Sequence, residues 1–396
     1  MPRFEPFSGL RYVPSHVSSL DDVLCPPYDV ISEDERSRLV ARSAYNIVRI
    51  ELPRCEDGED PYKVAALFLD AWRDGGVLRR DHQPAFYGYR MSHVDGDGAP
   101  RTTVGVIGAL GLEELGRGVL PHEHTTPKAS ADRLELLRAT RANTSPIWCL
   151  SPAGGLTALL GSPSHPAQRS RDDDGVVHEL WPITDRHQVY DIADLVTSQP
   201  VLIADGHHRY ETALAFQHEQ RGDQQERPGD HDLVLALVVE LAAEQLAVGA
   251  IHRLITGLPD GFDVLGELGR TFQLEPTDPA DASIERRMRH AGALAVVTPA
   301  GTWLARPPAD GAHELDAVVL DAALRTFPAH ELTFQHGWDR CADAVATGRA
   351  DAAVLLRPVE VERISAVAEG GERMPPKTTL FWPKPRTGLV LRELID

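Results

Sequence analysis

The spacing of apolar and polar positions along the chain predicts alternating helices and strands. The clearest helix covers residues 61–74, where five apolar side chains share one face: Val64, Leu67, Phe68, Ala71 and Trp72. Gly75-Gly76 follows and is typical of a helix C-terminus. Ser32 and Glu35 have the spacing of a capping box, which predicts a helix that runs to about Arg42. The alternating stretch 46–52 predicts a strand.

The rest of the pattern predicts a mixed α/β fold (α+β). Apolar stretches indicate strands at 85–91, 103–110, 146–150, 200–204, 293–298 and 352–356. Helical periodicity indicates helices at 130–142, 281–291 and 314–326, and another that begins just after Asp205. Residues 233–241 form a continuous apolar run, which is typical of a strand buried on both faces.

The length of 396 residues favours two or three domains. Residues 161–175 are rich in turn formers and charges, so we interpret them as a linker or an exposed loop. We therefore expect three regions: an N-terminal α/β region at 1–160, a core at 176–260 and a C-terminal α/β region at 261–396.

Composition and charge narrow the class of protein. Hydrophobic residues make up 42% of the chain and charged residues 25%, which is ordinary for a soluble globular protein. The net charge of −19 argues against duplex DNA or an anionic membrane as the main partner. No apolar run approaches the length of a membrane span, and the N-terminus lacks the apolar core of a signal peptide. The four scattered cysteines indicate reduced thiols, so we expect a cytoplasmic protein.

The strongest chemical signal is the segment ADGHHRYETAL at 204–214, where an apolar strand ends and a helix begins. Gly206 lets the backbone approach a ligand, and the first turn of a helix offers unpaired N–H groups to an anion. Arg209 is expected to point at the ligand and grip phosphate oxygens, and His207 and His208 add donors. The alternative is a helix start at which Asp205 is a cap and the histidines are solvated.

This segment resembles the phosphate-binding signature of the ParB/sulfiredoxin superfamily, and its DGHHR form is most similar to the free serine kinases. The whole chain is also similar to a bacterial and archaeal family known as domain of unknown function 1015. The resembling segments are 26–31, 46–49, 121–125, 204–213, 251–253 and 375–384. The resemblance implies a ParB/sulfiredoxin-like core at 176–260 and a nucleotide whose phosphates bind at residues 205–209.

A second constellation is HEHTTPK at 122–128, which is not the HExxH zinc signature because its histidines are two positions apart. A glutamate between histidines could serve as a general base. In the free serine kinases an acidic residue upstream of DGHHR activates the serine hydroxyl, and the resemblance makes Glu123 the candidate here, with Asp205 as a second catalytic residue. Glu123 precedes Asp205 by 82 positions, more than a minimal ParB-like core suggests. The alternative is a polar loop with an ordinary surface glutamate.

Other charged residues extend the predicted site. Arg49 could bind the carboxylate of an amino-acid-like substrate or could simply lie on the solvent face of a strand. His122, His252 and Arg253 are further candidates for substrate binding. Lys377 and Lys384 lie next to prolines, which can hold a lysine against a phosphate with little entropy loss. Both lysines could equally be solvated. No metal ligand is assigned.

The function that these features favour is phosphoryl transfer from ATP or ADP, with Mg²⁺, to a small hydroxyl metabolite such as free serine. The sequence has no P-loop, no GxGxxG after a strand and no GxSxG elbow, which removes the commonest NTPase, dinucleotide and esterase interpretations. Two alternatives stay open: a phosphatase, and a ParB-type nucleotide-binding regulatory module without catalysis. The expected partners are a small-molecule substrate and a nucleotide, with neither nucleic acid nor membrane; the sequence leaves a homodimer open.

Overall fold

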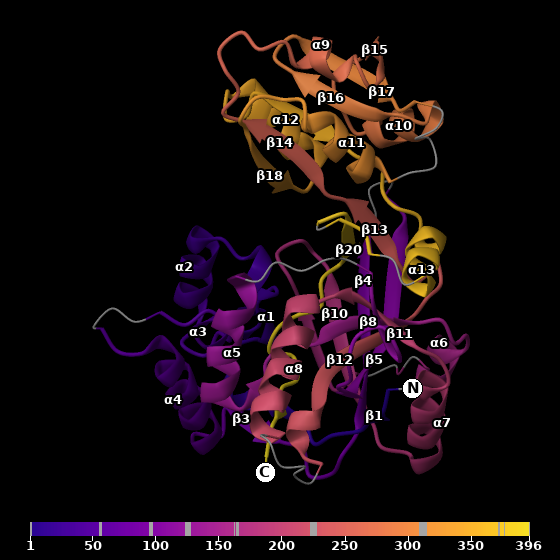
Figure 1. The fold of residues 1–396 in the computed structure, drawn as a ribbon. Coiled ribbons are helices and arrows are strands. Elements are labelled where there is room, and N and C mark those ends of the chain that lie inside the picture. Colours follow the sequence, from indigo (N-terminus) through magenta and orange to yellow (C-terminus); the bar gives the residue numbers. More distant parts are fainter. Residues whose placement is uncertain are drawn as a thin grey trace. The chain divides into compact units, whose positions relative to one another are not determined.

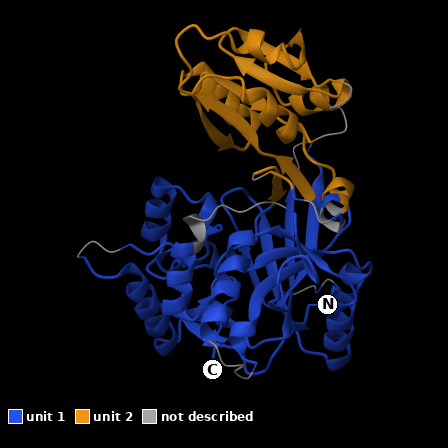
Figure 2. Cartoon of the chain, in the orientation of Figure 1, with its two compact units in different colours: residues 1–246, 367–373, 383–396 blue, residues 247–366, 374–382 orange. Residues whose placement is uncertain are grey.

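The computed structural model describes residues 2–54, 58–94, 98–122, 128–161, 163, 166–221, 228–308, 315–370, 373–375 and 377–395. The chain forms two compact units, of which unit 1 contains 1–246, 367–373 and 383–396 and unit 2 contains 247–366 and 374–382 (Figure 2). Unit 2 is therefore an insertion in the sequence of unit 1. The expected regions 1–160 and 176–260 fall largely within unit 1, and the expected region 261–396 is divided between the two units.

A nine-stranded sheet is the centre of unit 1. Its strands are β1 (Phe4–Glu5), β4 (Phe86–Val94), β5 (Pro100–Gly111), β6 (Val119–Pro121), β8 (Ile147–Ser151), β9 (Gln168–Arg171), β10 (Val177–Ile183), β11 (Val201–Asp205) and β12 (Leu233–Glu240). The strand order is β6-β11-β8-β12-β5-β4-β10-β9, with β1 beside β5. The pairs β6–β11 and β8–β12 are parallel and the other pairs are antiparallel. The expected mixed α/β class is confirmed.

The interior of this sheet explains the apolar runs in the sequence. β12 lies between β8 and β5, and its six residues from Val234 to Val239 are all buried. A strand paired on both sides and covered on both faces needs apolar residues at every position, since neither face meets water. The prediction of a buried strand at 233–241 is confirmed.

Helices cover both sides of the sheet. Those of unit 1 are α1 (Leu20–Val23), α2 (Glu33–Arg42), α3 (Val48–Glu51), α4 (Pro61–Asp74), α5 (Lys128–Thr140), α6 (Leu156–Leu160), α7 (Arg186–Thr197) and α8 (His207–Arg221). In Figure 1, α5 and α8 lie side by side on one side of the sheet, and α6 and α7 lie on the other. The expected helix starts are confirmed: Ser32 Oγ accepts a hydrogen bond from Glu35 N at 3.2 Å, and Pro61 begins α4.

Two local predictions are corrected. The expected strand at 46–52 is instead a turn followed by the short helix α3. The Asn46 side chain causes this, because Oδ1 accepts from Val48 N at 3.0 Å while Nδ2 donates to the carbonyl oxygen of Asp22 at 2.7 Å. Residues 161–175 were interpreted as a linker or an exposed loop. They contain β9, which pairs with β10 inside unit 1, so the linker interpretation is wrong.

Unit 2 is built on a six-stranded antiparallel sheet with the order β15-β17-β16-β19-β14-β18. Its strands are β14 (His252–Thr256), β15 (Gln273–Thr277), β16 (Leu294–Thr298), β17 (Gly301–Arg306), β18 (Glu331–Gln335) and β19 (Ala352–Leu355). The helices are α9 (Val264–Leu268), α10 (Ile284–Ala291), α11 (Asp316–Leu324) and α12 (Trp338–Ala346), while α13 (Val361–Glu369) crosses the boundary between the units. Strands β13 (Ala247–Ala250) and β20 (Thr379–Trp382) form a separate ribbon.

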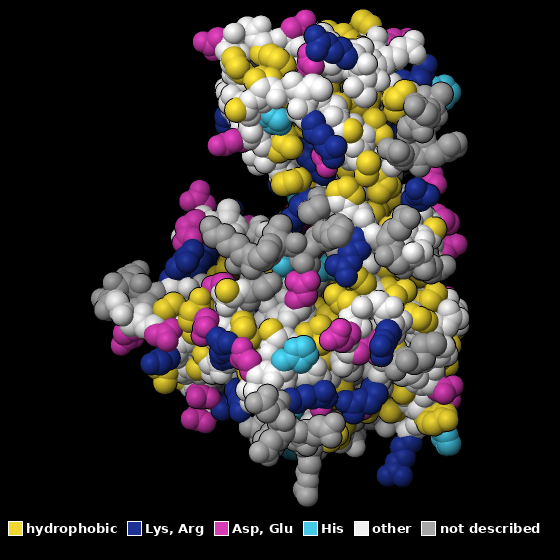
Figure 3. Space-filling view, in the orientation of Figure 1, with side chains coloured by type: hydrophobic (Ala, Val, Ile, Leu, Met, Phe, Trp, Pro, Cys, Tyr) yellow, Lys and Arg dark blue, Asp and Glu magenta, His cyan; other side chains and the backbone are white. Residues whose placement is uncertain are grey.

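The remaining elements of unit 1 are small. Strand β2 (Leu10–Tyr12) pairs with β3 (Leu78–Arg80), and β7 (Ala142–Asn143) pairs with β21 (Arg392–Glu393). Short 3₁₀ helices occur at Pro14–His16, Tyr28–Val30 and Asp230–Asp232. Among the described residues, no helix is long and apolar enough to cross a membrane. On the face of unit 1 shown in Figure 3, acidic and basic side chains are interspersed.

Candidate functional site

The turn between β11 and α8 carries the strongest signal of the sequence. β11 ends at Asp205, Gly206 adopts a left-handed conformation with φ of 92°, and α8 starts at His207. The hydrogen bond from Tyr210 N to the carbonyl oxygen of Gly206, 3.0 Å long, starts the helical ladder. The amides before Tyr210 lie in the first turn, where a helix presents N–H groups and the positive end of its dipole. The expected strand–turn–helix arrangement is confirmed.

The atoms around Gly206 disfavour any larger residue there, as its backbone conformation does. A Cβ atom there would lie 3.1 Å from both Arg209 Nη2 and Ile147 Cγ2. Any side chain at this position would therefore press against the guanidinium group in addition to straining the backbone. Glycine keeps the turn open next to the charged groups.

The Asp205 carboxylate is held by two cations. Lys384 Nζ lies 2.6 Å from Oδ1, and Arg209 Nη2 lies 3.0 Å from Oδ2. Burial by itself raises the pKa of Asp205, but Lys384 and Arg209 outweigh it and hold this pKa well below the ordinary aspartate value. One carboxylate and two cations leave a net charge of about +1 at the start of α8. This cluster, together with the helix dipole, favours an anion.

The sequence led us to expect that Arg209 points freely at a ligand. In the structure its guanidinium group is instead held by other groups of the protein. Besides Asp205, its Nη1 donates to the Pro146 carbonyl oxygen at 2.5 Å and to Ser145 Oγ at 3.1 Å. Its side chain is only 11% exposed. Residues 145–146 immediately precede β8, the neighbour of β11 in the sheet, and the sequence carried no signal for that contact.

Two histidines lie against each other beside the turn. His122 follows β6, whose Pro121 pairs with Ile203 of β11, and its Nδ1 donates to the Ile203 carbonyl oxygen at 2.5 Å. The rings of His122 and His207 have centroids 5.0 Å apart. His207 Nε2 is buried and has no hydrogen-bond partner among the described residues.

Both histidines are neutral near pH 7, so neither adds a positive charge to the turn. Burial lowers the pKa of His122 to about 4. Burial, followed by the neighbouring His122, lowers the pKa of His207 well below its ordinary value. A neutral imidazole still donates one hydrogen bond, so His207 could present Nε2–H to a phosphate oxygen. His208 is half-buried at the same turn.

Lys384 reaches Asp205 from a segment that we call the strap, residues 383–395, which belongs to unit 1. Thr387 N donates to the Cys25 carbonyl oxygen at 2.9 Å, and Gly388 N donates to the Thr144 carbonyl oxygen at 2.9 Å. Farther along, β21 pairs with β7. These contacts attach the strap to two separate segments of unit 1, around Cys25 and at residues 142–144. The interpretation of Lys384 as a merely solvated lysine does not fit its side-chain exposure of 15%.

Three predicted site residues, His252, Arg253 and Lys377, belong to unit 2. Arg253 is buried and donates from Nη1 to the carbonyl oxygens of Ile251, at 2.7 Å, and Lys377, at 3.0 Å. His252 is also buried, its Nδ1 accepts from Leu356 N at 3.2 Å, and burial lowers its pKa to about 4. The contacts of His252 and Arg253 are those of residues that stabilise unit 2.

Arg49 and Glu123 complete the predicted set. Arg49 lies on α3, and its Nη2 donates to the carbonyl oxygen of Val40 in the last turn of α2 at 3.0 Å, where a cation suits the helix C-terminus. Glu123 lies outside the described residues. Its neighbour in sequence, His122, is described, and its ring packs against that of His207.

A small polar pocket behind Arg209 was not foreseen. Its volume of about 50 Å³ is enough for a few water molecules. Buried Glu51 and Arg133 line it together with Thr144, whose hydroxyl donates to the Glu51 carboxylate. These residues come from distant parts of the chain, so no local motif indicates them. This pocket by itself is too small for a nucleotide.

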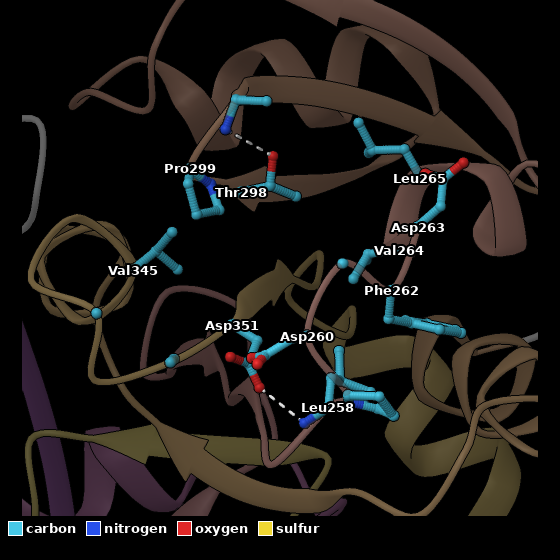
Figure 4. Close-up of a pocket in the computed structure, with 15 residues that line it drawn as sticks. Leu258, Asp260, Phe262, Asp263, Val264, Leu265, Thr298, Pro299, Val345 and Asp351 are labelled. Carbon is cyan, nitrogen blue, oxygen red and sulfur yellow. Dashed lines mark hydrogen bonds between the residues drawn. The ribbon is translucent and has the colours of Figure 1, made fainter.

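The larger cavity in unit 2 has the wrong charge for phosphate. It measures about 420 Å³ and lies next to α9, between Pro299 and Val345 on one side and Phe262 on the other (Figure 4). Three aspartates line it (Asp260, Asp263 and Asp351), and no lysine or arginine does. Carboxylates without cations repel an anionic ligand. Among the described residues, no group of three His, Cys, Asp or Glu side chains could hold a metal ion.

Comparisons with known proteins place the chain in a family. The family described as "Protein of unknown function (DUF1015)" matches residues 4–323. No curated protein matches the sequence. Similar solved structures include a free serine kinase in complex with AMP, with 13% identity, a TM-score of 0.40, and coverage of 72% of this chain and 98% of that chain.

A mutant free serine kinase in complex with ADP has 14% identity and a TM-score of 0.40, and the match covers 70% of this chain and 88% of that chain. A conserved hypothetical protein from Pyrococcus furiosus has 14% identity and a TM-score of 0.38, and the match covers 69% of this chain and 90% of that chain. These similarities assign no activity to this chain.

Proposed function

We propose that this chain, which belongs to the DUF1015 family, binds the phosphate groups of a nucleotide at the β11–α8 turn and transfers a phosphoryl group to a small hydroxyl metabolite. The observation that supports this most is the meeting of Lys384 and Arg209 on one carboxylate at the start of α8. Phosphoryl transfer depends mainly on positioning and on charge stabilisation, which fixed cations supply.

In this proposal Asp205 is a positioning residue rather than the proton acceptor. Both of its oxygens already accept hydrogen bonds from cations, and its lowered pKa makes it a weak base. Its carboxylate instead keeps two like charges together where phosphates would bind. Glu123 remains the proposed base for the acceptor hydroxyl.

The proposed donor rests on the charge of the site, and the proposed acceptor rests on the sequence resemblance. The proposed donor is ATP or ADP, because the first turn of α8 and the cations Lys384 and Arg209 together suit phosphate groups. Free serine is the first acceptor to test, on the strength of the DGHHR resemblance. The described residues provide no Mg²⁺ site of their own, since the Asp205 oxygens are occupied by cations.

The test is transfer of labelled phosphate from γ-labelled ATP and β-labelled ADP to a panel of amino acids and other hydroxyl metabolites. We expect transfer by the natural chain and its loss in Lys384→Ala. Lys63→Ala, an exposed lysine on α4, is the matched control and should transfer normally.

Each other outcome identifies an alternative. Nucleotide binding without transfer to any acceptor would identify a regulatory binding module, and release of phosphate from phosphorylated metabolites would identify a phosphatase. Absence of nucleotide binding in the folded natural chain would overturn the proposal.

A further inference from the structure

Lys384 depends on the strap for its position, because it belongs to no helix or strand. Pro383 and Pro385 flank it; they restrict φ but have no N–H with which to tie the backbone down. The first backbone anchor described after Lys384 is Arg386, whose N–H donates to the hydroxyl of Tyr89 at 3.2 Å. The next anchors, Thr387 and Gly388, are farther along the chain.

Tyr89 is itself held by a buried chain of hydrogen bonds. Its hydroxyl lies 2.8 Å from His178 Nδ1, and His178 Nε2 lies 3.0 Å from Asp172 Oδ2. The other oxygen of Asp172 accepts from Val176 N at 2.8 Å. Tyr89 and His178 are 1% and 0% exposed, so water does not compete for these bonds.

The donor and acceptor roles along this chain are fixed. Burial lowers the pKa of His178, so the ring is neutral near pH 7. A carboxylate only accepts, so Nε2 carries the hydrogen and Nδ1 must accept the hydroxyl hydrogen of Tyr89. The Tyr89 oxygen is then left to accept from Arg386 N–H. Burial raises the pKa of Tyr89, which keeps the hydroxyl protonated.

Tyr89 also stands on a rigid part of unit 1. It lies on β4, between β5 and β10 in the interior of the nine-stranded sheet. Its pairing partner on β10 is Leu180, so His178, two residues away, shares its face of the sheet. The rings of Tyr89 and His178 are stacked, with centroids 6.0 Å apart. A strand that is paired on both sides provides a firm support for the strap.

We propose that Tyr89, oriented by His178 and Asp172, is a positioning residue that sets the strap so that Lys384 meets Asp205. This inference rests on the proposed phosphate site for its functional consequence, but its structural content is independent of nucleotide. A lysine has a long flexible side chain, so a fixed backbone limits the space that its ammonium explores. Arg386 is also held through its side chain, since Nη2 donates to the Leu24 carbonyl oxygen at 3.2 Å. Loss of the Tyr89 hydroxyl should therefore free only the Arg386 N–H, which is the backbone bond nearest to Lys384, and loosen Lys384.

The test compares Tyr89→Phe with a matched control on the same strand. Tyr87 is also fully buried, and its hydroxyl accepts from Gly9 N and donates to Asp81, each at 2.7 Å. Tyr87→Phe therefore removes an equally buried hydroxyl with two bonds but does not release Arg386. Differences between the two variants report on the strap rather than on general loss of a buried hydrogen bond.

The first measurement is NMR of the ammonium group of Lys384 without nucleotide. The sequence has four lysines (Lys63, Lys128, Lys377 and Lys384), so lysine labelling gives a simple spectrum that Lys384→Ala assigns. We expect the Lys384 signal to move toward that of a solvated lysine in Tyr89→Phe and to stay in Tyr87→Phe. An unchanged signal in folded Tyr89→Phe would overturn the inference. If Tyr89→Phe does not fold, His178→Phe, which frees the hydroxyl to turn, should give the same shift; an unchanged signal overturns the inference.

The second measurement is ADP titration of a double-mutant cycle. Tyr89→Phe should weaken ADP binding about 3- to 10-fold, the range for loss of one hydrogen bond. The same substitution should cost nothing further in a Lys384→Ala background, because Tyr89 acts through Lys384. Equal losses in both backgrounds would overturn the inference. If the natural chain does not bind ADP, the proposed function fails, while the Lys384 signal still decides the role of Tyr89.

Discussion

The ammonium group of Lys384 lies 2.6 Å from Oδ1 of Asp205, although 179 positions separate the two residues in the chain. The other oxygen of this carboxylate accepts a hydrogen bond from Arg209. The strongest motif of the sequence is therefore completed by a lysine from a segment that no local pattern connects with it.

Asp205→Asn should expose the repulsion between the two cations. We expect the free energy of unfolding to fall by about 1–3 kcal/mol, less than for a fully buried ion pair because the site is partly exposed. Inorganic phosphate should then raise the melting temperature of this variant more than that of the natural chain, since phosphate can replace the lost negative charge. Thermal unfolding with and without phosphate measures both effects. An equal response of the two proteins would contradict an anion site here.

Arg209→Ala should weaken folding as well as nucleotide binding. The guanidinium bonds to Asp205, Ser145 and the Pro146 carbonyl oxygen, so truncation should cost about 2–4 kcal/mol of unfolding free energy. Arg138, an exposed arginine on α5 that pairs with Glu219, is the control, and Arg138→Ala should cost less than about 1 kcal/mol. Urea unfolding of both variants checks the contrast. Similar small losses would show that Arg209 is not part of the framework.

Gly206→Ala separates backbone strain from crowding of the cations. Gly155 has a similar φ, 98° against 92°, but no atom lies within 4 Å of the position that its Cβ would take. Both alanine variants should lose about 1–2 kcal/mol from the left-handed backbone. Only Gly206→Ala should also weaken ADP binding, because its Cβ displaces Arg209. Calorimetric titration decides this, and matching ADP affinities would argue against a ligand at the turn.

The free energy of unfolding should decrease as the pH is lowered, because His122 is buried in its neutral form. Its pKa is about 4 in the folded chain against 6.5 when unfolded, so between these values the unfolded chain binds a proton that the folded chain does not. Stability is therefore full above pH 6.5 and declines toward pH 4, by up to about 3 kcal/mol from this group. The pKa of His207 is shifted in the same direction.

Urea unfolding at pH 7.5 and pH 5 tests this assignment. The difference in unfolding free energy between the two pH values should shrink in His122→Gln and shrink further when His207→Gln is added. A difference that both variants retain would mean that other groups cause the pH dependence.

Glu123→Gln tests the proposed base. Glutamine keeps the size of the side chain but cannot take a proton, so ADP affinity should stay within about threefold while phosphoryl transfer falls at least roughly 100-fold. Glu114→Gln, a surface acid, is the control and should leave transfer unchanged. Equal transfer rates in the two variants would remove Glu123 from the mechanism.

Sequence patterns predicted the elements of this fold where a single periodicity covers a whole element. Helix α4 begins and ends where expected, because Pro61 and Gly75 mark its ends and its apolar face is continuous. The stretch 46–52 misled the prediction because five residues of alternation fit a strand, whereas Asn46 hydrogen bonds turn the chain. Side-chain hydrogen bonds of this kind depend on Asp22 and Leu24, which no window around Asn46 contains.

The candidate site was predictable in its local part only. Asp205, Gly206 and Arg209 are one motif, so strand, turn and helix signals located them together. Both Lys377 and Lys384 were predicted from the sequence to bind phosphate, but no pattern indicated that the two lysines belong to different units. Ser145 and the Pro146 carbonyl oxygen were missed because their contact with Arg209 follows from the pairing of β8 with β11, and strand order is set by the whole core.

The insertion of unit 2 between residues 246 and 383 of unit 1 has a consequence for synthesis on the ribosome. The strands of the nine-stranded sheet are complete once β12 has emerged, yet the strap emerges only after residues 247–382 have been made. At 5–20 residues per second, that stretch takes roughly 7–27 s. During this interval the surface that the strap covers, including Leu10 and Cys25, lacks its partner. Nascent unit 1 therefore leaves the backbone groups of Leu10 and Cys25 unpaired by the strap until the last residues of the chain are made.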